Sequence, residues 1–257
     1  MSDDAVRVER TTGTPAGRFA LEHAHYAEDL DHWRAIARDA GGEVLDLGAA
    51  TGRVTLALAR DGHHVTAVDH DPGMIDQIIL ATRIERDLAG HVDAVVADLR
   101  TLDLGRRYPA AILPMNTLQA FVAPDDRRAV LRNVRGHLEP GGLFAFDVVM
   151  ADLAALTDIV GEVIPGVVHH DPSGVTLRHG ARFEDVDPGT GTVRFTILID
   201  DGGTRYEREH EVHLFSPSEL VELLAEADLR VLAVHGDFDG APLDDMSERQ
   251  VYRCEAA

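Results

Sequence analysis

Apolar and polar residues follow a pattern along the first 150 positions that predicts strands and helices in turn. Short apolar runs predict buried strands, and longer stretches with apolar residues every third or fourth position predict amphipathic helices between them. The predicted strands span residues 44–48, 65–69, 92–97, 110–114 and 143–149. The predicted helices span residues 53–61, 72–88 and 125–138, after an earlier helix with Leu30, Trp33, Ile36 and Ala37 on one face. This order indicates a parallel sheet that is covered by helices on both sides.

From about residue 160 the pattern changes to the alternation of apolar and polar residues that is typical of half-buried strands. Three strands at 175–186, 193–199 and 205–214 predict an antiparallel meander, with a turn at residues 200–203. Ser216, Pro217 and Glu219 then match a capping box with proline at the first helical position, which predicts a helix start. Strands at 229–235 and 248–254 follow this helix.

The pattern as a whole predicts an α/β fold with a doubly wound, mainly parallel sheet of seven strands, Rossmann-like, and an antiparallel β lid as an insertion. We expect four parts. Residues 1–40 form an N-terminal tail and a cap helix, with a mobile tail up to about residue 18, and residues 41–150 form the cofactor-binding core. Residues 151–215 form the lid, and residues 216–257 add a helix and a strand pair that complete the core sheet.

The charge of the chain argues against two kinds of partner. There are 24 basic and 45 acidic residues, so the formal net charge is −21, which repels phosphate backbones and anionic membranes. We therefore expect neither nucleic acid nor a membrane as a partner. Cys254 is the only cysteine, and the acidic N-terminus has no apolar run behind it, so we expect a cytoplasmic protein without disulfides. The oligomeric state stays open, with a homodimer as one alternative.

A glycine turn between the first strand and its helix is the clearest candidate for a ligand site. Gly48 and Gly52 let the backbone turn sharply and let a ligand approach the N–H groups at the positive end of the helix dipole. Asp69 ends the second strand 21 residues beyond Gly48, which is the position of an acid that binds ribose hydroxyls. An adenosine-containing cofactor is therefore expected, and both a nicotinamide dinucleotide and S-adenosylmethionine fit.

The composition of the turn favours the second of these cofactors. A dinucleotide site needs a third glycine three residues after the second so that the pyrophosphate fits, and this chain has none there. The bulkier turn suits an adenosine that carries an amino acid. Asp46 on the first strand is placed to hold the ammonium group of such a ligand, directly or through water.

With these features the chain resembles the class I S-adenosylmethionine-dependent methyltransferases, most closely their small-molecule, natural-product branch. The resemblance lies in the stretches VLDLGAATGRVTLALARDGHHVTAVDHDPGMID, VVADLRTLDL, LEPGGLFAFDV and GDFDGAPL. It implies that Gly48, Ala49 and Gly52 approach the methionine part of the cofactor and that Asp69 holds the ribose. It also implies that Asp98 and Leu99 flank the adenine, with Asp98 bonded to its amino group. Ala50 stands where the family usually has a glycine.

The resemblance also suggests residues near the reacting methyl group. Further residues expected around the cofactor are Tyr26, Trp33, Asp46, His70, Met74, Pro114 and Met115. Asn116 and Gln119 are catalytic candidates, because the segment after the fourth strand lies at the carboxyl edge of the sheet. The resemblance adds Tyr26, because an N-terminal segment of the family folds over the cofactor with an aromatic side chain near the reacting methyl group. Many relatives have a histidine base where this chain has Ala120, so the base comes from His179 or His210 of the lid, or none is used. Gln119, His179, Arg208 and His210 are the expected acceptor-binding residues, and no metal is implied.

The predicted function is methyl transfer from S-adenosylmethionine to a small-molecule acceptor, with S-adenosylhomocysteine as the second product. An amine nitrogen ranks above an oxygen as the methylated atom by analogy with relatives. Alignment of the two substrates and closure of the lid would account for much of the rate. Two alternatives stay open. One is a protein of the same fold that binds S-adenosylmethionine without transferring a methyl group, as a cyclase or a binding protein, and the other is a nicotinamide oxidoreductase.

Overall fold

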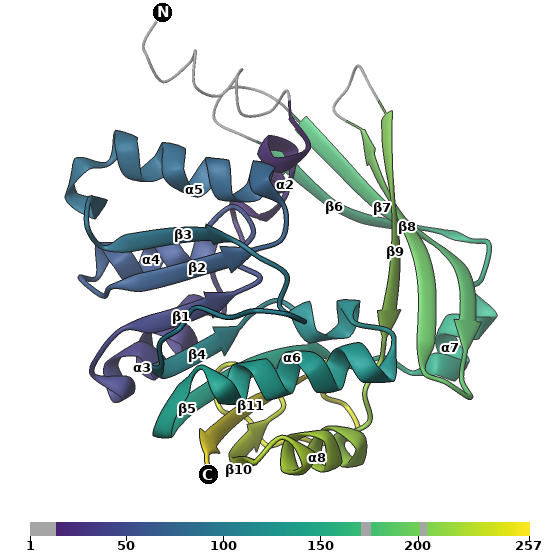
Figure 1. Ribbon diagram of the computed structural model, residues 1–257. Helices are drawn as coiled ribbons and strands as arrows, with labels where there is room; N and C mark the ends of the chain where they lie inside the picture. Colours follow the sequence, from purple (N-terminus) through teal and green to yellow (C-terminus); the bar gives the residue numbers. More distant parts are fainter. Residues whose placement is uncertain (1–13, 171–175, 201–204) are drawn as a thin grey trace, which may run out of the picture.

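The computed structural model describes residues 14–170, 176–200 and 205–257 and contains two β-sheets (Figure 1). The main sheet has seven strands in the order β10-β11-β5-β4-β1-β2-β3, and the lid sheet has four strands in the order β6-β7-β8-β9. The five strands β3, β2, β1, β4 and β5 are parallel to one another, and β11 is antiparallel to both β5 and β10. The predicted doubly wound sheet with an antiparallel insertion is therefore confirmed.

The strands of the main sheet come from both ends of the chain. They are β1 (Val44–Leu47), β2 (Val65–Asp69), β3 (Val92–Val96), β4 (Tyr108–Leu113), β5 (Leu138–Val149), β10 (Leu229–His235) and β11 (Arg249–Ala256). Every residue of β1 and β2 is buried, because helices cover both faces of the sheet at its centre. This burial on both faces explains why these strands are continuous apolar runs without alternation.

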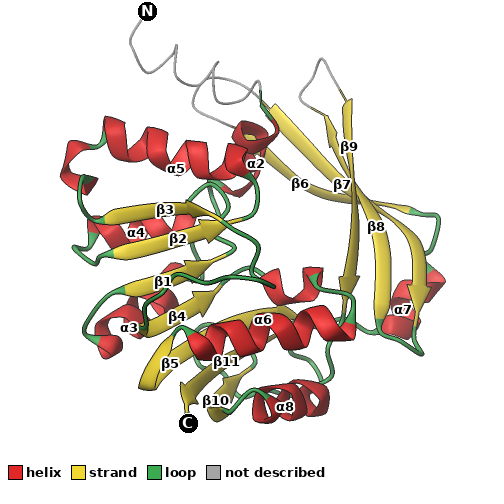
Figure 2. Cartoon of the chain, viewed as in Figure 1, coloured by secondary structure: helices red, strands yellow, loops and turns green. Residues whose placement is uncertain are grey.

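Helices form a layer on each side of the main sheet (Figure 2). One layer holds α3 (Leu30–Ala40), α4 (Arg53–Arg60) and α5 (Pro72–Ile84), and the other holds α6 (Pro124–Gly136) and α8 (Pro217–Glu226). The two layers pack against opposite faces through separate apolar clusters. Two short 3₁₀ helices, η1 (Arg86–Leu88) and η2 (Thr117–Ala120), follow α5 and β4.

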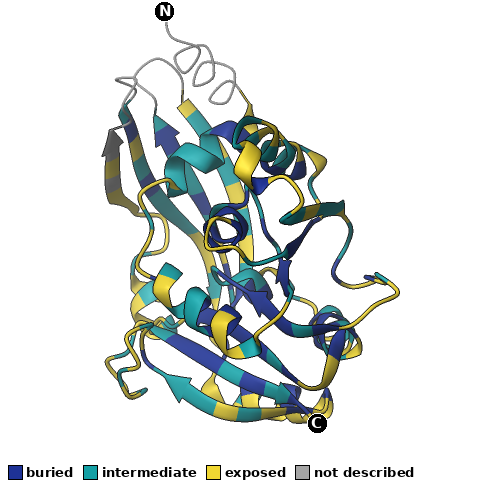
Figure 3. Cartoon of the chain, turned by 90° about the vertical axis from the view of Figure 1, so that its left-hand side faces the viewer, coloured by how far each residue is buried: buried dark blue, intermediate teal, exposed yellow. Residues whose placement is uncertain are grey.

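The lid sheet lies to one side of the main sheet and is less buried than it (Figures 1 and 3). Its strands are β6 (Val163–His170), β7 (Thr176–Asp187), β8 (Thr192–Asp200) and β9 (Arg205–His213), and each pairs antiparallel with the next. The predicted meander of three strands was incomplete, because β6 and the short helix α7 (Leu153–Asp158) were not predicted. The predicted turn at residues 200–203 lies mostly outside the described residues.

The N-terminal region differs from the prediction of a tail up to about residue 18. Helix α2 (Pro15–His23) begins at Pro15, and the Thr14 hydroxyl accepts a hydrogen bond from Gly17 N at 3.0 Å. Proline at the first turn and a threonine N-cap favour this start. Residues 1–13 lie outside the described residues. Helix α2 lies between α5 and the lid sheet (Figure 1).

None of the helices within the described ranges is both long and apolar enough to cross a lipid bilayer.

Candidate functional site

The glycine turn lies at the edge of the main sheet where the parallel strands end. Gly48, Ala50 and Gly52 all have positive φ angles, of 68°, 47° and 86°. Glycine adopts this conformation without strain, but alanine does not, because its Cβ approaches the backbone. A Cβ atom on Gly48 would lie 2.5 Å from Cγ2 of Thr117 in η2. The turn therefore requires glycine at position 48, and it packs directly against the loop that follows β4.

Asp69 at the end of β2 is bonded to the turn itself. Its Oδ2 accepts a hydrogen bond from Ala50 N at 2.9 Å, and its Oδ1 accepts one from Asp71 N at 2.9 Å. Each carboxylate oxygen keeps a second lone pair, so these bonds leave acceptor capacity for hydroxyl groups. The side chain that was expected to bind ribose thus also fixes the shape of the glycine turn.

Asp46 on β1 is a buried carboxylate with one unused oxygen. Its Oδ2 accepts a hydrogen bond from the Thr55 hydroxyl at 2.5 Å, and its Oδ1 has no hydrogen-bond partner. Burial raises the pKa of Asp46 to about 7, against the opposing effect of the hydrogen bond from Thr55. An orphaned acceptor of this kind fits a ligand donor such as an ammonium group.

Asp98 and its neighbours follow β3, where the adenine is expected. Two nitrogens of Arg100 bind the Asp98 carboxylate, at 3.0 and 2.6 Å, and hold its pKa at about 2. Arg100 also bonds Asp126 at 3.1 Å. The side chain of Asp98 is 37% exposed, so it is ionised and reachable, but an adenine amino group would share it with Arg100. Arg100 was not among the predicted site residues.

The remaining expected cofactor residues differ in their exposure. Leu99 is 7% exposed, whereas Met74 is half-buried and the His70 side chain is 84% exposed. Pro114 is buried at the end of β4, and its carbonyl accepts a hydrogen bond from the Thr117 hydroxyl at 2.6 Å. Ala49 is buried and donates its N–H to the Val68 carbonyl at 3.0 Å.

A group of interacting polar side chains connects α3 and the segment before it to the glycine turn. Asp29 is fully buried and bonds both terminal nitrogens of Arg53, each at 2.6 Å, and the indole N–H of Trp33 at 2.7 Å. The guanidinium of Arg53 also lies 4.9 Å from the centroid of the Tyr26 ring, and the Tyr26 hydroxyl is 3.1 Å from a terminal nitrogen of Arg249. Tyr26 is thus held close to the turn, and burial raises its pKa.

Trp33 requires a correction. Its side chain is 0% exposed and packs in the core beside Ile36 and Val54, so no surface of the indole is open to a ligand. It acts on the site through Asp29, and the expectation that it contacts the cofactor is wrong.

The loop after β4 holds Asn116 in an unusual conformation. Met115 and Asn116 have φ angles of 56° and 60°, so two consecutive residues other than glycine are left-handed. Met115 N donates a hydrogen bond to Oδ1 of Asp147 on β5 at 2.7 Å, which anchors this turn. The Oδ1 atom of Asn116 is buried and has no hydrogen-bond partner. Strained residues of this kind cluster where a ligand or substrate is bound.

Gln119 also requires a correction. Its Nε2 donates to the carbonyls of Val149 and His213, both at 3.2 Å, and its Oε1 accepts from Val149 N at 3.0 Å. The side chain is 1% exposed, so both of its donors are used inside the protein. Gln119 ties the end of β5 to the end of β9 at the base of the lid, and it is not placed to bind an acceptor.

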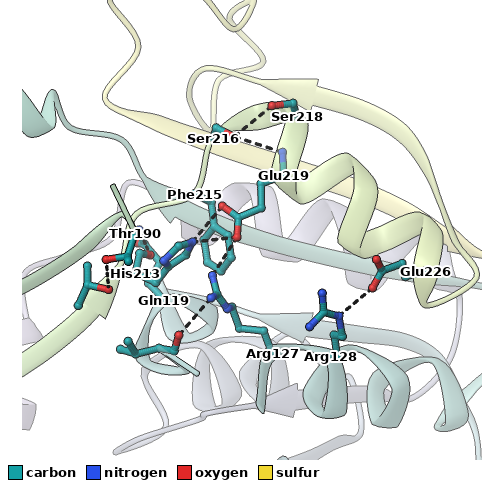
Figure 4. Close-up of polar contacts among 12 residues, drawn as sticks. Gln119, Arg127, Arg128, Thr190, His213, Phe215, Ser216, Ser218, Glu219 and Glu226 are labelled. Atoms are coloured by element: carbon teal, nitrogen blue, oxygen red, sulfur yellow. Dashed lines mark hydrogen bonds and ion pairs between the residues drawn. The ribbon is translucent and has the colours of Figure 1, made fainter. Parts of the chain in front are cut away.

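Next to Gln119, an ion-pair network fixes the start of α8 to α6 (Figure 4). Glu219 binds Nη1 of Arg127 at 2.9 Å and Nε2 of His213 at 2.9 Å. The Ser216 hydroxyl accepts a hydrogen bond from Glu219 N at 3.2 Å, as predicted for an N-cap. In a capping box the Glu219 side chain would also accept a hydrogen bond from the backbone N–H of Ser216. Here the Glu219 carboxylate instead pairs with the buried guanidinium of Arg127 and with His213.

The three predicted acceptor residues of the lid come together at α2. Glu22 of α2 binds Nδ1 of His179 at 3.3 Å and Nη2 of Arg208 at 3.2 Å. Arg208 Nε in turn donates to Nε2 of His210 at 2.8 Å. Burial and the nearby Arg208 cation lower the pKa of His210. Glu22 was not predicted, because the sequence places it 157 residues before His179.

Two observations show that the residues at the carboxyl edge of the main sheet are chemically suited to S-adenosylmethionine. A buried, unpartnered oxygen lies on Asp46, and the glycine turn offers its backbone beside the Asp69 carboxylate. These groups suit an ammonium group and ribose hydroxyls. Within the described ranges, no three histidine, cysteine, aspartate or glutamate side chains gather in a way that could hold a metal ion.

Comparison with known proteins gives a match that includes the glycine turn, Asp69 and the loop after β4. The methyltransferase domain family matches residues 44–142. Carboxy-S-adenosyl-L-methionine synthase of Vibrio campbellii is 29% identical over 132 residues, which are 50% of this chain and 51% of that protein. The chain therefore spans about half the length of that relative. Cypemycin N-terminal methyltransferase of Streptomyces sp is 28% identical over 207 residues, 79% of this chain and 78% of that protein.

A solved structure extends the likeness of the fold to nearly the whole chain. The CcbJ methyltransferase from Streptomyces caelestis superposes with a TM-score of 0.78 and 24% sequence identity, and the match covers 91% of this chain and 98% of that one. The fold of that methyltransferase thus accounts for residues well beyond the matched domain.

Proposed function

We propose that the chain is a class I S-adenosylmethionine-dependent methyltransferase, and that it methylates an amine nitrogen of a small-molecule acceptor, with S-adenosylhomocysteine as the second product. The observation that carries this proposal is the buried and unpartnered Oδ1 of Asn116, held by a strained turn directly beside the glycine turn. An acceptor with an N–H group would satisfy this oxygen.

The cofactor would be held by groups from three strand ends. Asp69 would bind the ribose hydroxyls, and the backbone of Gly48, Ala49 and Gly52 would approach the methionine part. Oδ1 of Asp46 would accept a hydrogen bond from the ammonium group. Around the adenine we assign Asp98 and Leu99, with His70, Met74, Pro114 and Met115 nearby. When bound, the cofactor supplies a methyl group on a positively charged sulfur.

On the acceptor side, the protein orients a nitrogen lone pair toward that methyl group. Asn116 would accept the N–H of the amine, and Tyr26 would close the site from the N-terminal cap. Such alignment supplies a large part of the rate of a bimolecular displacement.

An amine that arrives as ammonium must first lose a proton. His210 is a poor candidate for this base, because its Nε2 already accepts a hydrogen bond from Arg208. His179 is the better candidate of the two.

The cypemycin N-terminal methyltransferase supports an amine acceptor. Its name assigns methylation to an N-terminus, and its match to this chain reaches beyond the matched domain, over 79% of the residues. The unpartnered group after β4 is the amide oxygen of Asn116, not an acidic or basic side chain. A neutral acceptor of this kind agrees with an N–H group on the methyl acceptor.

Lid closure is the second part of the proposal. The lid sheet joins the core through β9 and η2, where Gln119 and the Glu219 pairs fix its base, and through Glu22 of α2 at its other end. A sheet held at its base and paired to the cap by ionic contacts can close over bound substrates and exclude water.

A second candidate is modification of S-adenosylmethionine itself without methyl transfer to an acceptor. It is favoured by the match to the carboxy-S-adenosyl-L-methionine synthase, which covers the cofactor domain. That match covers only half of this chain, whereas the likeness to a methyltransferase structure includes the lid. We therefore place methyl transfer first.

The test combines binding with product analysis. Calorimetric titration with S-adenosylhomocysteine should show binding to the wild type, at least about tenfold weaker binding to Asp69→Ala, and unchanged binding to Asp125→Ala. The control side chain is fully exposed on α6. Incubation with methyl-labelled cofactor and a library of small amines should give labelled products. A modified cofactor without labelled amine would instead support the second candidate, and no binding by the wild type would refute both.

A further inference from the structure

The face of the lid sheet that is turned toward α2 carries positive charge, in contrast to the chain as a whole. The net charge of the chain is −21, yet among the described residues of this face and α2 a single carboxylate, Glu22, has His23, His179, Arg208 and His210 around it, and Arg18 lies on the same face over the Tyr206 ring. With the histidines neutral, these residues carry one net positive charge. A local field opposite to the overall charge indicates a site for an anion.

The members of the central ion pair differ in their exposure. Both oxygens of Glu22 face Arg208 or His179, and its side chain is 11% exposed. The side chain of Arg208 is 35% exposed. A ligand can therefore reach the cation of this pair but not the anion. This difference favours an acidic over a basic group on the ligand.

A second guanidinium lies on the same face. Arg18 of α2 lies 4.0 Å from the centroid of the Tyr206 ring, and Tyr206 is two positions before Arg208 on β9. Two positions along a strand correspond to about 7 Å. Among the residues that the structure describes, no carboxylate forms an ion pair with Arg18. Arg18 therefore lies over the position next to Arg208 on the same face of β9, and two arginines at neighbouring positions can bind one carboxylate together.

A row of rings lies next to this pair of arginines. Phe183 and Phe195 are cross-strand neighbours with centroids 5.9 Å apart, and Phe195 stacks on His210 at 5.2 Å with an angle of 15° between the rings. All three rings are half-buried. The hydrogen bond from Arg208 fixes the His210 ring parallel to Phe195. The row offers a flat apolar surface that ends at a cation.

We propose that the acceptor is an anionic molecule, with an acid group that binds Arg208 and Arg18 and a flat apolar body that lies along Phe195 and His210. This inference rests on the proposed function and names the substrate class of the same site. An acceptor that carries both this acid group and the methylated amine would resemble an amino acid. The overall acidity of the chain favours a cationic acceptor, but that charge lies largely outside this face.

The experiment compares an acid with its amide. Ligand-observed NMR would measure binding of 4-hydroxyphenylacetate and of 4-hydroxyphenylacetamide to enzyme saturated with S-adenosylhomocysteine. We expect the acid to bind the wild type at least about tenfold more tightly than the amide, as for a hydrogen bond to a charged group. Arg208→Gln should remove this preference, and Arg208→Lys should keep part of it, because it retains the charge.

Arg194→Gln is the matched control. Arg194 lies on β8 of the same sheet, is 55% exposed and pairs with Asp185 on the other face, so the substitution removes the same charge without touching the proposed site. Equal binding of acid and amide, binding of neither, or an equal loss in the control would overturn the inference. Calorimetry with S-adenosylhomocysteine on the same samples separates this result from failure of the proposed function, which would abolish cofactor binding as well.

Discussion

The carboxylate of Asp29 accepts a hydrogen bond from each terminal nitrogen of Arg53, both at 2.6 Å. Asp29 immediately precedes α3, and Arg53 is the first residue of α4, directly after Gly52 of the glycine turn. This bidentate pair is buried on the carboxylate side and also receives the indole N–H of Trp33. It therefore fixes the N-terminal cap to the helix start that would carry the cofactor.

Asp29→Ala is expected to lower both stability and cofactor affinity. The substitution leaves the guanidinium of Arg53, which is 16% exposed, without its counter-ion, and removal of one partner from such a buried pair costs about 3–5 kcal/mol. Denaturant unfolding and titration with S-adenosylhomocysteine measure the two effects. The control is Asp31→Ala, two positions later, whose side chain is 95% exposed and pairs with Arg34 at the surface. Equal effects of the two substitutions would contradict the assigned role of the pair.

Ala50→Gly is expected to stabilise the protein slightly. Ala50 adopts a φ of 47°, which costs a residue with a Cβ atom about 1–2 kcal/mol, while glycine loses about 0.5–1 kcal/mol more backbone entropy on folding. The Ala50 N–H to Asp69 remains in the variant. We therefore expect an increase in Tm of roughly 2 °C in thermal unfolding.

The neighbouring alanine provides the control for this prediction. Ala49 is 8% exposed and is not left-handed, so Ala49→Gly should lower the Tm through lost packing and added chain entropy. If both variants lose stability to the same extent, strain at position 50 is not released by glycine.

That the glycine turn and Asp69 lie together could be predicted from the sequence, because these residues follow strand ends in chain order. Gly48, Gly52 and Asp69 lie within 22 consecutive positions, and the parallel order of β1 and β2 brings them together. The same local pattern predicted the order of strands and helices in the main sheet.

Contacts between distant segments could not be predicted in this way. Asp147 meets Met115, and Glu22 meets Arg208, through pairings that depend on the tertiary fold. Gln119 was misinterpreted for the same reason, because its amide partners come from β5 and β9. Strand β6 was missed since its glycine and proline interrupt the alternation of apolar and polar residues.

The pH dependence of stability should reveal the buried Asp147. Burial raises the pKa of this side chain to about 7, against an ordinary value of 3.8. In the range between these values the folded protein holds a proton that the unfolded chain has lost, so stability falls as the pH rises from about 4 to 7 and is flat above that range. Asp46 contributes in the same direction.

Asp147→Asn should reduce this loss of stability while it keeps an oxygen for the Met115 N–H. The change in the free energy of unfolding between pH 5 and pH 8 is expected to differ between wild type and variant by at most about 3 kcal/mol, since about two pH units of this range lie below the folded pKa. Parallel pH profiles for the two proteins would show that Asp147 titrates normally in the folded state.

Glu219 and Glu226 allow a direct comparison of two ion pairs between the same helices, α6 and α8 (Figure 4). Glu219 binds Arg127, whose side chain is 6% exposed, and His213, whereas Glu226 binds Arg128, which is 40% exposed. Loss of the first partner leaves a buried guanidinium unpaired, while loss of the second leaves a solvated one. Glu219→Ala should therefore lower the free energy of unfolding by about 3 kcal/mol or more, and Glu226→Ala by less than about 1 kcal/mol. Because Glu219 also lies beside the base of the lid, Glu219→Ala should increase hydrogen exchange at the end of β9, and Glu226→Ala should not. Similar stability losses in both variants would show that burial of Arg127 does not determine the strength of this junction.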